Sequence, residues 1–139
     1  MVDKEILQGK LHFIEKTLAK LYLLRQLTSE DFLGNFQSVD SAKHNLQVAI
    51  EAIVDIANHI IARERYGLPD SSAEAIGLLA EHGILELELV RRLRLMVKFR
   101  NRIIHLYQEV DDAQIYRILQ EDLGDIKAFV KAIITKFSF

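Results

Sequence analysis

Apolar residues recur at alternating steps of four and three over long parts of this chain. The two clearest stripes are Leu7, Leu11, Ile14, Leu18 and Leu21, and then Leu46, Ile50, Ile53, Ala57 and Ile60. This spacing gathers the apolar side chains on one face of an α-helix. With one proline and six glycines in 139 residues, the chain offers few points at which a helix must end. The pattern therefore predicts long amphipathic helices and no sheet.

Capping residues and breakers set the expected helix boundaries. We expect long helices over about residues 3–27, 40–66, 85–107 and 112–137, and a short one over 72–83. Asp40 or Ser41 is the expected start of the second helix, and Ser71 opens the short one in a Ser-x-x-Glu capping box. Asp111-Asp112 is the expected cap of the last helix. The prediction is a single all-α domain over residues 1–139, an up-and-down bundle of four long helices plus a short helix.

Charge is unevenly distributed along the chain. The net charge is −2, yet residues 91–102, RRLRLMVKFRNR, contain six basic residues and no acidic one. Such a local excess of cations is typical of proteins with a phosphate-bearing partner, although it also occurs on solvated helix faces.

Several functional classes lack their sequence signatures here. The chain has no cysteine, no Glu-x-x-His, no zinc-binding His-Glu-x-x-His and no glycine-rich phosphate loop, so we expect neither a metal site nor a cofactor. No apolar run approaches the ~20 residues of a membrane span. The N-terminal MVDKEILQGK is acidic and amphipathic rather than a secretory signal. We therefore expect a cytoplasmic protein that does not cross a membrane.

The fourth expected helix carries polar residues at unusual positions. Its apolar row reads Leu89, Leu93, Met96, Arg100, Ile103 and Tyr107. Arg100 thus lies in an apolar seam, where a guanidinium needs an anionic partner. The alternative without a function is a structural ion pair of Arg100 with Asp55 or Glu51. A different face of the helix carries the basic residues Arg91, Arg94, Lys98 and Arg102 together with His105. Taken alone, an exposed histidine and a tyrosine in an apolar seam are also common in proteins that have no site there.

The stretch Phe99-Arg100-Asn101-Arg102-Ile103-Ile104-His105-Leu106-Tyr107 resembles the Arg-x4-His-x-Tyr motif of the HEPN superfamily, and specifically of the HepT-like toxins. Asp111-Asp112 shortly beyond it and residues 49–60, similar to the second helix of that family, extend the match over nearly the whole chain. Leu106 is a departure, because many relatives have glycine there and leucine would restrict the turn after His105.

The resemblance implies a metal-independent endoribonuclease that acts as the toxin of a toxin–antitoxin pair. Arg100 and His105 would be catalytic and Asn101 supporting, while Arg91, Arg94, Lys98 and Arg102 would bind RNA phosphates. The antitoxin in this family is a minimal nucleotidyltransferase, which in relatives attaches nucleotide monophosphates (AMPylation) to the tyrosine that corresponds to Tyr107.

Two other functions stay open at this point. One is a non-catalytic HEPN-like module that binds a nucleotide or a nucleotidyltransferase partner, and the other is a plain dimerisation bundle. Arg100 and His105, five residues apart, lie about 140° apart on a regular helix, so one helix cannot aim both at one phosphate. We therefore expect a homodimer in which Arg100 of one chain approaches His105 of the other, as the resemblance also implies.

Overall fold

Helices account for nearly all of the regular structure in the computed structural model, which describes all 139 residues. They are α1 (Lys4–Arg25), α2 (Ser29–Leu33), α3 (Phe36–Glu64), α4 (Ser72–Glu81), α5 (Leu87–His105), the 3-10 turn η1 (Tyr107–Glu109), α6 (Asp112–Glu121) and α7 (Leu123–Phe137). The expected all-α bundle is confirmed.

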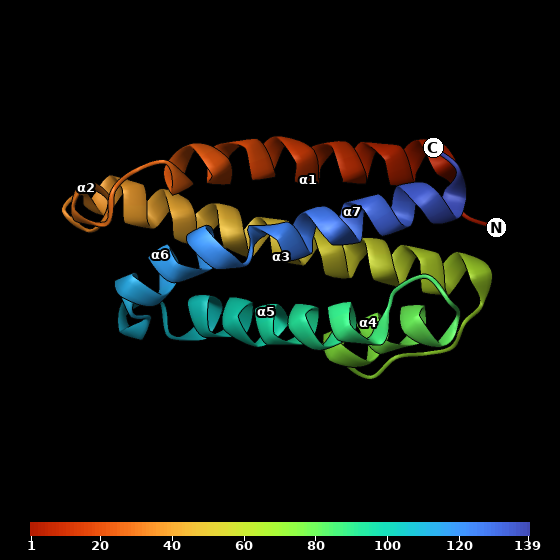
Figure 1. The fold of residues 1–139 in the computed structure, drawn as a ribbon. Helices are drawn as coiled ribbons and strands as arrows, with labels where there is room; N and C mark the ends of the chain where they lie inside the picture. The colour runs from red at the N-terminus through yellow and green to blue at the C-terminus, as the bar shows by residue number, and fades with distance from the viewer.

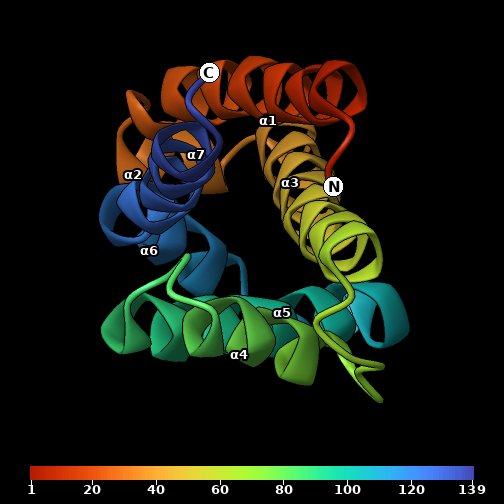
Figure 2. The ribbon, with the colours of Figure 1, turned by 90° about the vertical axis from the view of Figure 1, so that its right-hand side faces the viewer.

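The long helices lie side by side, with α3 passing through the middle of the bundle (Figure 1). Seen nearly along α3, α1 covers one side of the bundle and the α4–α5 pair covers the opposite side (Figure 2). Helix α3 packs against α1, α2, α4, α5, α6 and α7. Its apolar side chains Ile50, Ile53, Ile56 and Ile60 are at most 1% exposed, so α3 forms the centre of the core.

Helix α3 is longer than the sequence pattern indicates, because it begins at Phe36 rather than at Asp40 or Ser41. The side chain of Asn35 accepts a hydrogen bond of 2.9 Å from the backbone N–H of Gln37 and so caps the helix. Asp40 therefore lies within the first turns of α3 with its carboxylate free for other contacts.

Two further boundaries differ from expectation. Helix α5 ends at His105, because Leu106 leaves the helical region with φ −134° and ψ 42°. The expected fifth helix is divided at Asp122 into α6 and α7. The division lets α6 turn against α2, where Tyr116 packs on Phe32 with ring centroids 5.4 Å apart, while α7 runs along α1. The expected caps at Ser71 and Asp111 are confirmed.

None of the helices combines the length and the apolar character that crossing a bilayer requires.

We predict that Ile53→Ala lowers the free energy of unfolding by about 2–5 kcal/mol, because it leaves a cavity at the centre of the core. Leu68→Ala is the matched control, since Leu68 is 94% exposed and should change stability by less than about 0.5 kcal/mol. Urea unfolding followed by circular dichroism measures both values. Equal effects of the two substitutions would contradict the central position of α3.

Candidate functional site

The residues of the Arg-x4-His-x-Tyr motif lie at one end of the bundle. Helix α5 ends there, η1 follows, and α6 begins, all beside the first turns of α3 (Figure 1). The site is thus built from the end of one helix and the start of another, which are far apart in the sequence.

Arg100 occupies the buried face of α5 but has no anionic partner. Its side chain is half-buried, and its Nε is buried without any hydrogen-bond partner. The ion pair considered from the sequence does not form, because Asp55 pairs with Lys10 and Glu51 accepts a hydrogen bond from Gln47. A half-buried guanidinium with unused donors is suited to an anion that arrives from solution.

His105 is the last residue of α5 and is exposed, and its side chain makes no hydrogen bond within the chain. Asn101, one turn earlier, is exposed as well. Leu106 makes the turn after His105 with a negative φ, which any L-residue adopts, so leucine does not prevent the turn here. The backbone N–H of Leu106 still donates to the carbonyl of Arg102 at 2.7 Å, which closes the helix.

Tyr107 does not continue α5 as the pattern indicated but begins η1 and folds back against α3. Its Oη donates a hydrogen bond of 2.8 Å to Oδ1 of Asp40. Burial, this hydrogen bond, and the charges of Asp40 and Asp112 raise the pKa of Tyr107 to about 12, because all of them disfavour a phenolate.

Lys43 of α3 holds the segment from Tyr107 to Asp112 in place. It is 6% exposed, and its Nζ lies 4.5 Å from the centre of the Tyr107 ring. The Nζ also donates to the backbone carbonyl of Tyr107 at 3.3 Å and lies 3.3 Å from Oδ1 of Asp112. Three elements, α3, η1 and α6, therefore meet at this ammonium group.

The sequence interpretation did not single out Asp40 and Lys43 as site residues. The sequence pattern places Asp40 at the start of a helix, where a capping role is expected. Lys43 carried a usable signal, because the seam of α3 extended backward from Leu46 passes through Lys43 and Val39. A cation in an apolar seam is the same irregularity that marks Arg100.

Basic residues of α5 line two neighbouring grooves. Arg91, Lys98 and Arg102 line a groove of about 570 Å³ that Arg92 and Arg117 also line. Arg94 lines the neighbouring groove together with Arg91 and Lys98, and its Nε donates to the carbonyl of Ala73 at 3.0 Å. Its guanidinium lies over Gly77, where an added Cβ would be 2.2 Å from Nη2. Arg94 thus ties α4 to α5.

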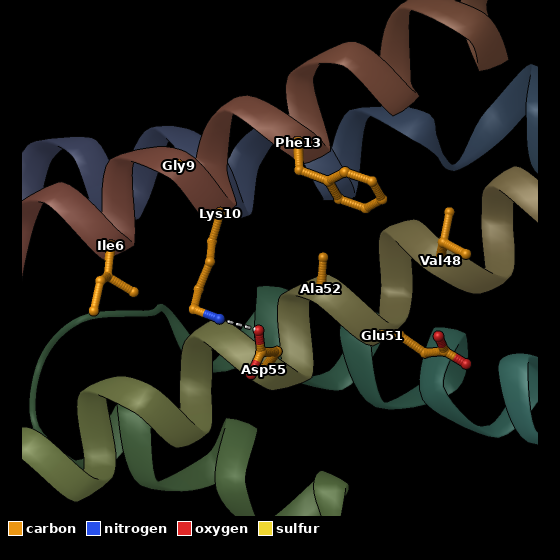
Figure 3. Close-up of a pocket in the computed structure, with 8 residues that line it drawn as sticks. All are labelled: Ile6, Gly9, Lys10, Phe13, Val48, Glu51, Ala52 and Asp55. Atoms are coloured by element: carbon orange, nitrogen blue, oxygen red, sulfur yellow. Dashed lines mark hydrogen bonds and ion pairs between the residues drawn. The ribbon is translucent and has the colours of Figure 1, made fainter.

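A second groove, of about 510 Å³, lies between α1 and α3. Figure 3 shows the Lys10–Asp55 ion pair bridging its two helices, with Ile6 and Phe13 along α1. No residue of the motif lines this groove, so it is separate from the site at the end of α5.

Known proteins share this helical bundle. Over 102 residues the chain is 36% identical to the mRNA nuclease HepT of Shewanella oneidensis, covering 73% of this chain and 77% of that protein. It is 25% identical over 132 residues to the tRNA nuclease HepT of Aphanizomenon flos-aquae, covering 95% and 90%. A tri-AMPylated Shewanella oneidensis HEPN toxin, solved in complex with MNT antitoxin, matches with a TM-score of 0.87 at 32% identity, covering 97% and 99%.

The helical bundle and its motif thus define a ribonuclease of the HEPN class. Residues 13–133 match the family Ribonuclease HepT-like, and the chain belongs to that family. The ribonuclease toxin expected from the sequence is confirmed at the level of the family.

We predict that one of the four tyrosines ionises at about pH 12, and that Asp40→Asn moves this ionisation toward the ordinary value of 10.0. Because the pKa of Tyr107 is raised in the folded state, its contribution to stability is complete below about pH 10 and is lost as the pH rises toward 12. Phenolate absorbance of wild type, Asp40→Asn and Tyr107→Phe measures this. Identical titrations of wild type and Asp40→Asn would contradict the Asp40–Tyr107 contact.

Proposed function

We propose that this chain is a metal-independent endoribonuclease, the cytoplasmic toxin of a toxin–antitoxin pair, and that Arg100 and His105 carry the cleavage. The observation that supports this most is the half-buried guanidinium of Arg100, whose Nε has no partner within the chain. A buried donor without a partner is costly, so this unsatisfied guanidinium favours a role toward the RNA phosphate.

The chemistry fits the two side chains. RNA carries its own nucleophile, since the 2′-OH can attack the adjacent phosphorus and expel the 5′-oxygen of the next nucleotide. His105 would accept the proton of the 2′-OH, because imidazole titrates near neutral pH and its exposure lets substrate reach it. Arg100 would donate hydrogen bonds to the phosphate oxygens as negative charge develops in the transition state. Asn101, exposed on the same turn as Arg100, would help to orient the phosphate.

The two catalytic groups require a second copy of the chain. Arg100 lies on the face of α5 that is buried in the bundle, whereas His105 lies at its exposed end. Apolar side chains near these two groups are exposed to solvent: Leu95 is 56%, Ile104 43% and Leu106 47% exposed. We propose that these residues pack against a second protomer, whose His105 then completes the site around Arg100.

The RNA strand would follow the basic groove beside α5. Arg91, Lys98 and Arg102 line it together with Arg92 and Arg117. Asp122 and Asp125 line it as well, and Arg92 pairs with Asp125 and Glu88, so we expect the first three cations and Arg117 to contact the RNA. Arg94 is held against α4 by Ala73, so we expect it to contribute least to RNA binding. Binding through these phosphate contacts would weaken as salt is added.

We predict that the purified protein cleaves RNA in EDTA and that His105→Ala slows cleavage by at least about 100-fold, since it removes the proton acceptor. Arg100→Ala should have an effect of similar size. Gel analysis of labelled RNA fragments measures the rates, and circular dichroism checks that each variant is folded. A wild-type protein that cuts no RNA in EDTA would favour the non-catalytic binding module instead.

A heterodimer separates a composite site from a site within one chain. Arg100→Ala and His105→Ala protomers with different tags are co-expressed, and the mixed dimer is purified through both tags. One of its two sites then holds both wild-type side chains, so it should recover about half of the wild-type activity. No recovery, or no mixed dimer to purify, would exclude the composite site.

The proposed partner is a minimal nucleotidyltransferase antitoxin, as in the solved complex of the Shewanella oneidensis toxin with MNT antitoxin. Tyr107 is the proposed acceptor, since its hydroxyl group lies at an exposed contact beside the end of α5. The hydroxyl of Tyr116, by contrast, is bound to the carbonyl of Leu27 in a part-buried contact. A nucleotide on Tyr107 would add phosphate charge and bulk at the end of α5, where it would compete with RNA.

We predict that co-expression with the nucleotidyltransferase adds nucleotide monophosphates to Tyr107 and suppresses RNA cleavage. Intact mass and peptide mapping locate the adducts, and Tyr107→Phe is the control that should carry none. Adducts confined to Tyr22, Tyr66 or Tyr116 would overturn this assignment.

A further inference from the structure

The Tyr107 hydroxyl contacts a carboxylate that has no role in the proposed RNA cleavage. Its hydrogen bond goes to a carboxylate of α3, Asp40, at 2.8 Å, and the contact is exposed to solvent. Asp40 makes no ion pair, and its side chain is hydrogen-bonded to this phenol. The carboxylate therefore touches the atom that would receive the nucleotide.

We propose that Asp40 is the proton acceptor for the transfer of a nucleotide to Tyr107. The toxin would thus supply part of the chemistry of its own inactivation. This inference rests on the proposed modification of Tyr107 and adds the group that activates it.

The step is a displacement at phosphorus. Oη of Tyr107 attacks the α-phosphorus of a nucleoside triphosphate, such as ATP, held by the nucleotidyltransferase. The new Oη–P bond forms as the bond from the α-phosphorus to the bridging oxygen breaks, and pyrophosphate leaves with that electron pair. The Oη proton passes to Oδ1 of Asp40 and then to solvent. Carboxylates accept the hydroxyl proton of the acceptor in the same way in protein kinases.

The phenol needs such an acceptor. With a pKa of about 12, only about one Tyr107 in 10⁵ is a phenolate at pH 7. The neutral phenol is a weak nucleophile until its proton begins to leave. As the bond to phosphorus forms, the oxygen becomes more acidic, and a carboxylate already bound to its hydrogen takes the proton without rearrangement.

Two other charged groups lie near this phenol. Lys43 of α3 holds the ring and backbone of Tyr107, and Asp112 of α6 pairs with Lys43 at 3.3 Å. The contacts of Lys43 with the ring and the carbonyl of Tyr107 fix the orientation of the phenol toward Asp40. Asp112 adds negative charge near the phenol, yet it forms an ion pair with Lys43 and not a hydrogen bond with the hydroxyl group. It is therefore the natural control for effects of charge alone.

The test measures transfer of labelled nucleotide from ATP to the full-length chain by its partner nucleotidyltransferase. Asp40→Asn keeps an oxygen that can accept the hydrogen bond but cannot take a proton at neutral pH. It should lower kcat about 100- to 1,000-fold at pH 7, with little change in KM for the toxin. Asp40→Glu restores a carboxylate and should stay within about tenfold of wild type. Asp112→Asn should stay within about twofold.

The pH dependence separates proton transfer from mere positioning. The ratio of the wild-type rate to the Asp40→Asn rate cancels the titration of the nucleotidyltransferase itself. The variant can react only through the phenolate, and the fraction of phenolate rises about tenfold per pH unit. The ratio should therefore fall about tenfold per pH unit between pH 7 and 9. A ratio that does not change with pH, or a variant as fast as wild type, would overturn the proposal. So would an equal loss in Asp112→Asn.

The proposed function is tested separately in the same series. Tyr107→Phe should take up no nucleotide, and labelling of that variant would refute Tyr107 as the acceptor. Unlabelled Tyr107→Phe together with wild-type labelling of Asp40→Asn would refute the role of Asp40 alone. RNA cleavage by unmodified Asp40→Asn should equal that of wild type, which also shows that the variant is folded.

Discussion

The burial of α3 is the constraint on which this structure depends. This helix contacts every other α-helix, and its isoleucines form the centre of the core. Along its middle turns, polar side chains such as Glu51 and Asp55 lie only on the face away from the core. At its first turns the seam turns polar with Lys43 and, on the outer side, Asp40. The end of α5 is packed against these turns through Tyr107, so the candidate site forms where the apolar core stops.

Two cations interrupt apolar seams in this chain, and their environments differ. Lys43 is almost fully buried but has a carboxylate, a carbonyl and an aromatic ring around it. Those contacts offset the cost of removing an ammonium group from water. Arg100 has no comparable set, and its Nε remains unsatisfied. The contrast assigns a structural role to Lys43 and leaves Arg100 available to an anionic substrate.

The Tyr107 contacts connect RNA cleavage to its proposed inactivation. The segment from His105 to Asp112 is short, and Lys43 holds it at both Tyr107 and Asp112. The proposed base His105 therefore stands two residues from a tyrosine fixed on α3. A nucleotide added to that tyrosine would replace its hydrogen bond with Asp40 and bring phosphate next to two carboxylates. The modification would thus disturb the position of His105 as well as block the phosphate site.

Much of the fold followed from the sequence, because the spacing of apolar residues and the capping side chains are local properties. The seams of α1 and α3, the caps at Ser71 and Asp111, and the half-buried position of Arg100 were all readable in this way. The family followed from the motif around Arg100 and His105. Other features required the tertiary structure: the early start of α3, the break at Asp122, the attachment of Arg94 to α4, and the pairing of Asp40 with Tyr107. The last of these joins residues separated by 67 positions, and no periodicity within one helix encodes such a contact. It exists because packing on α3 brings the start of one helix beside the end of another.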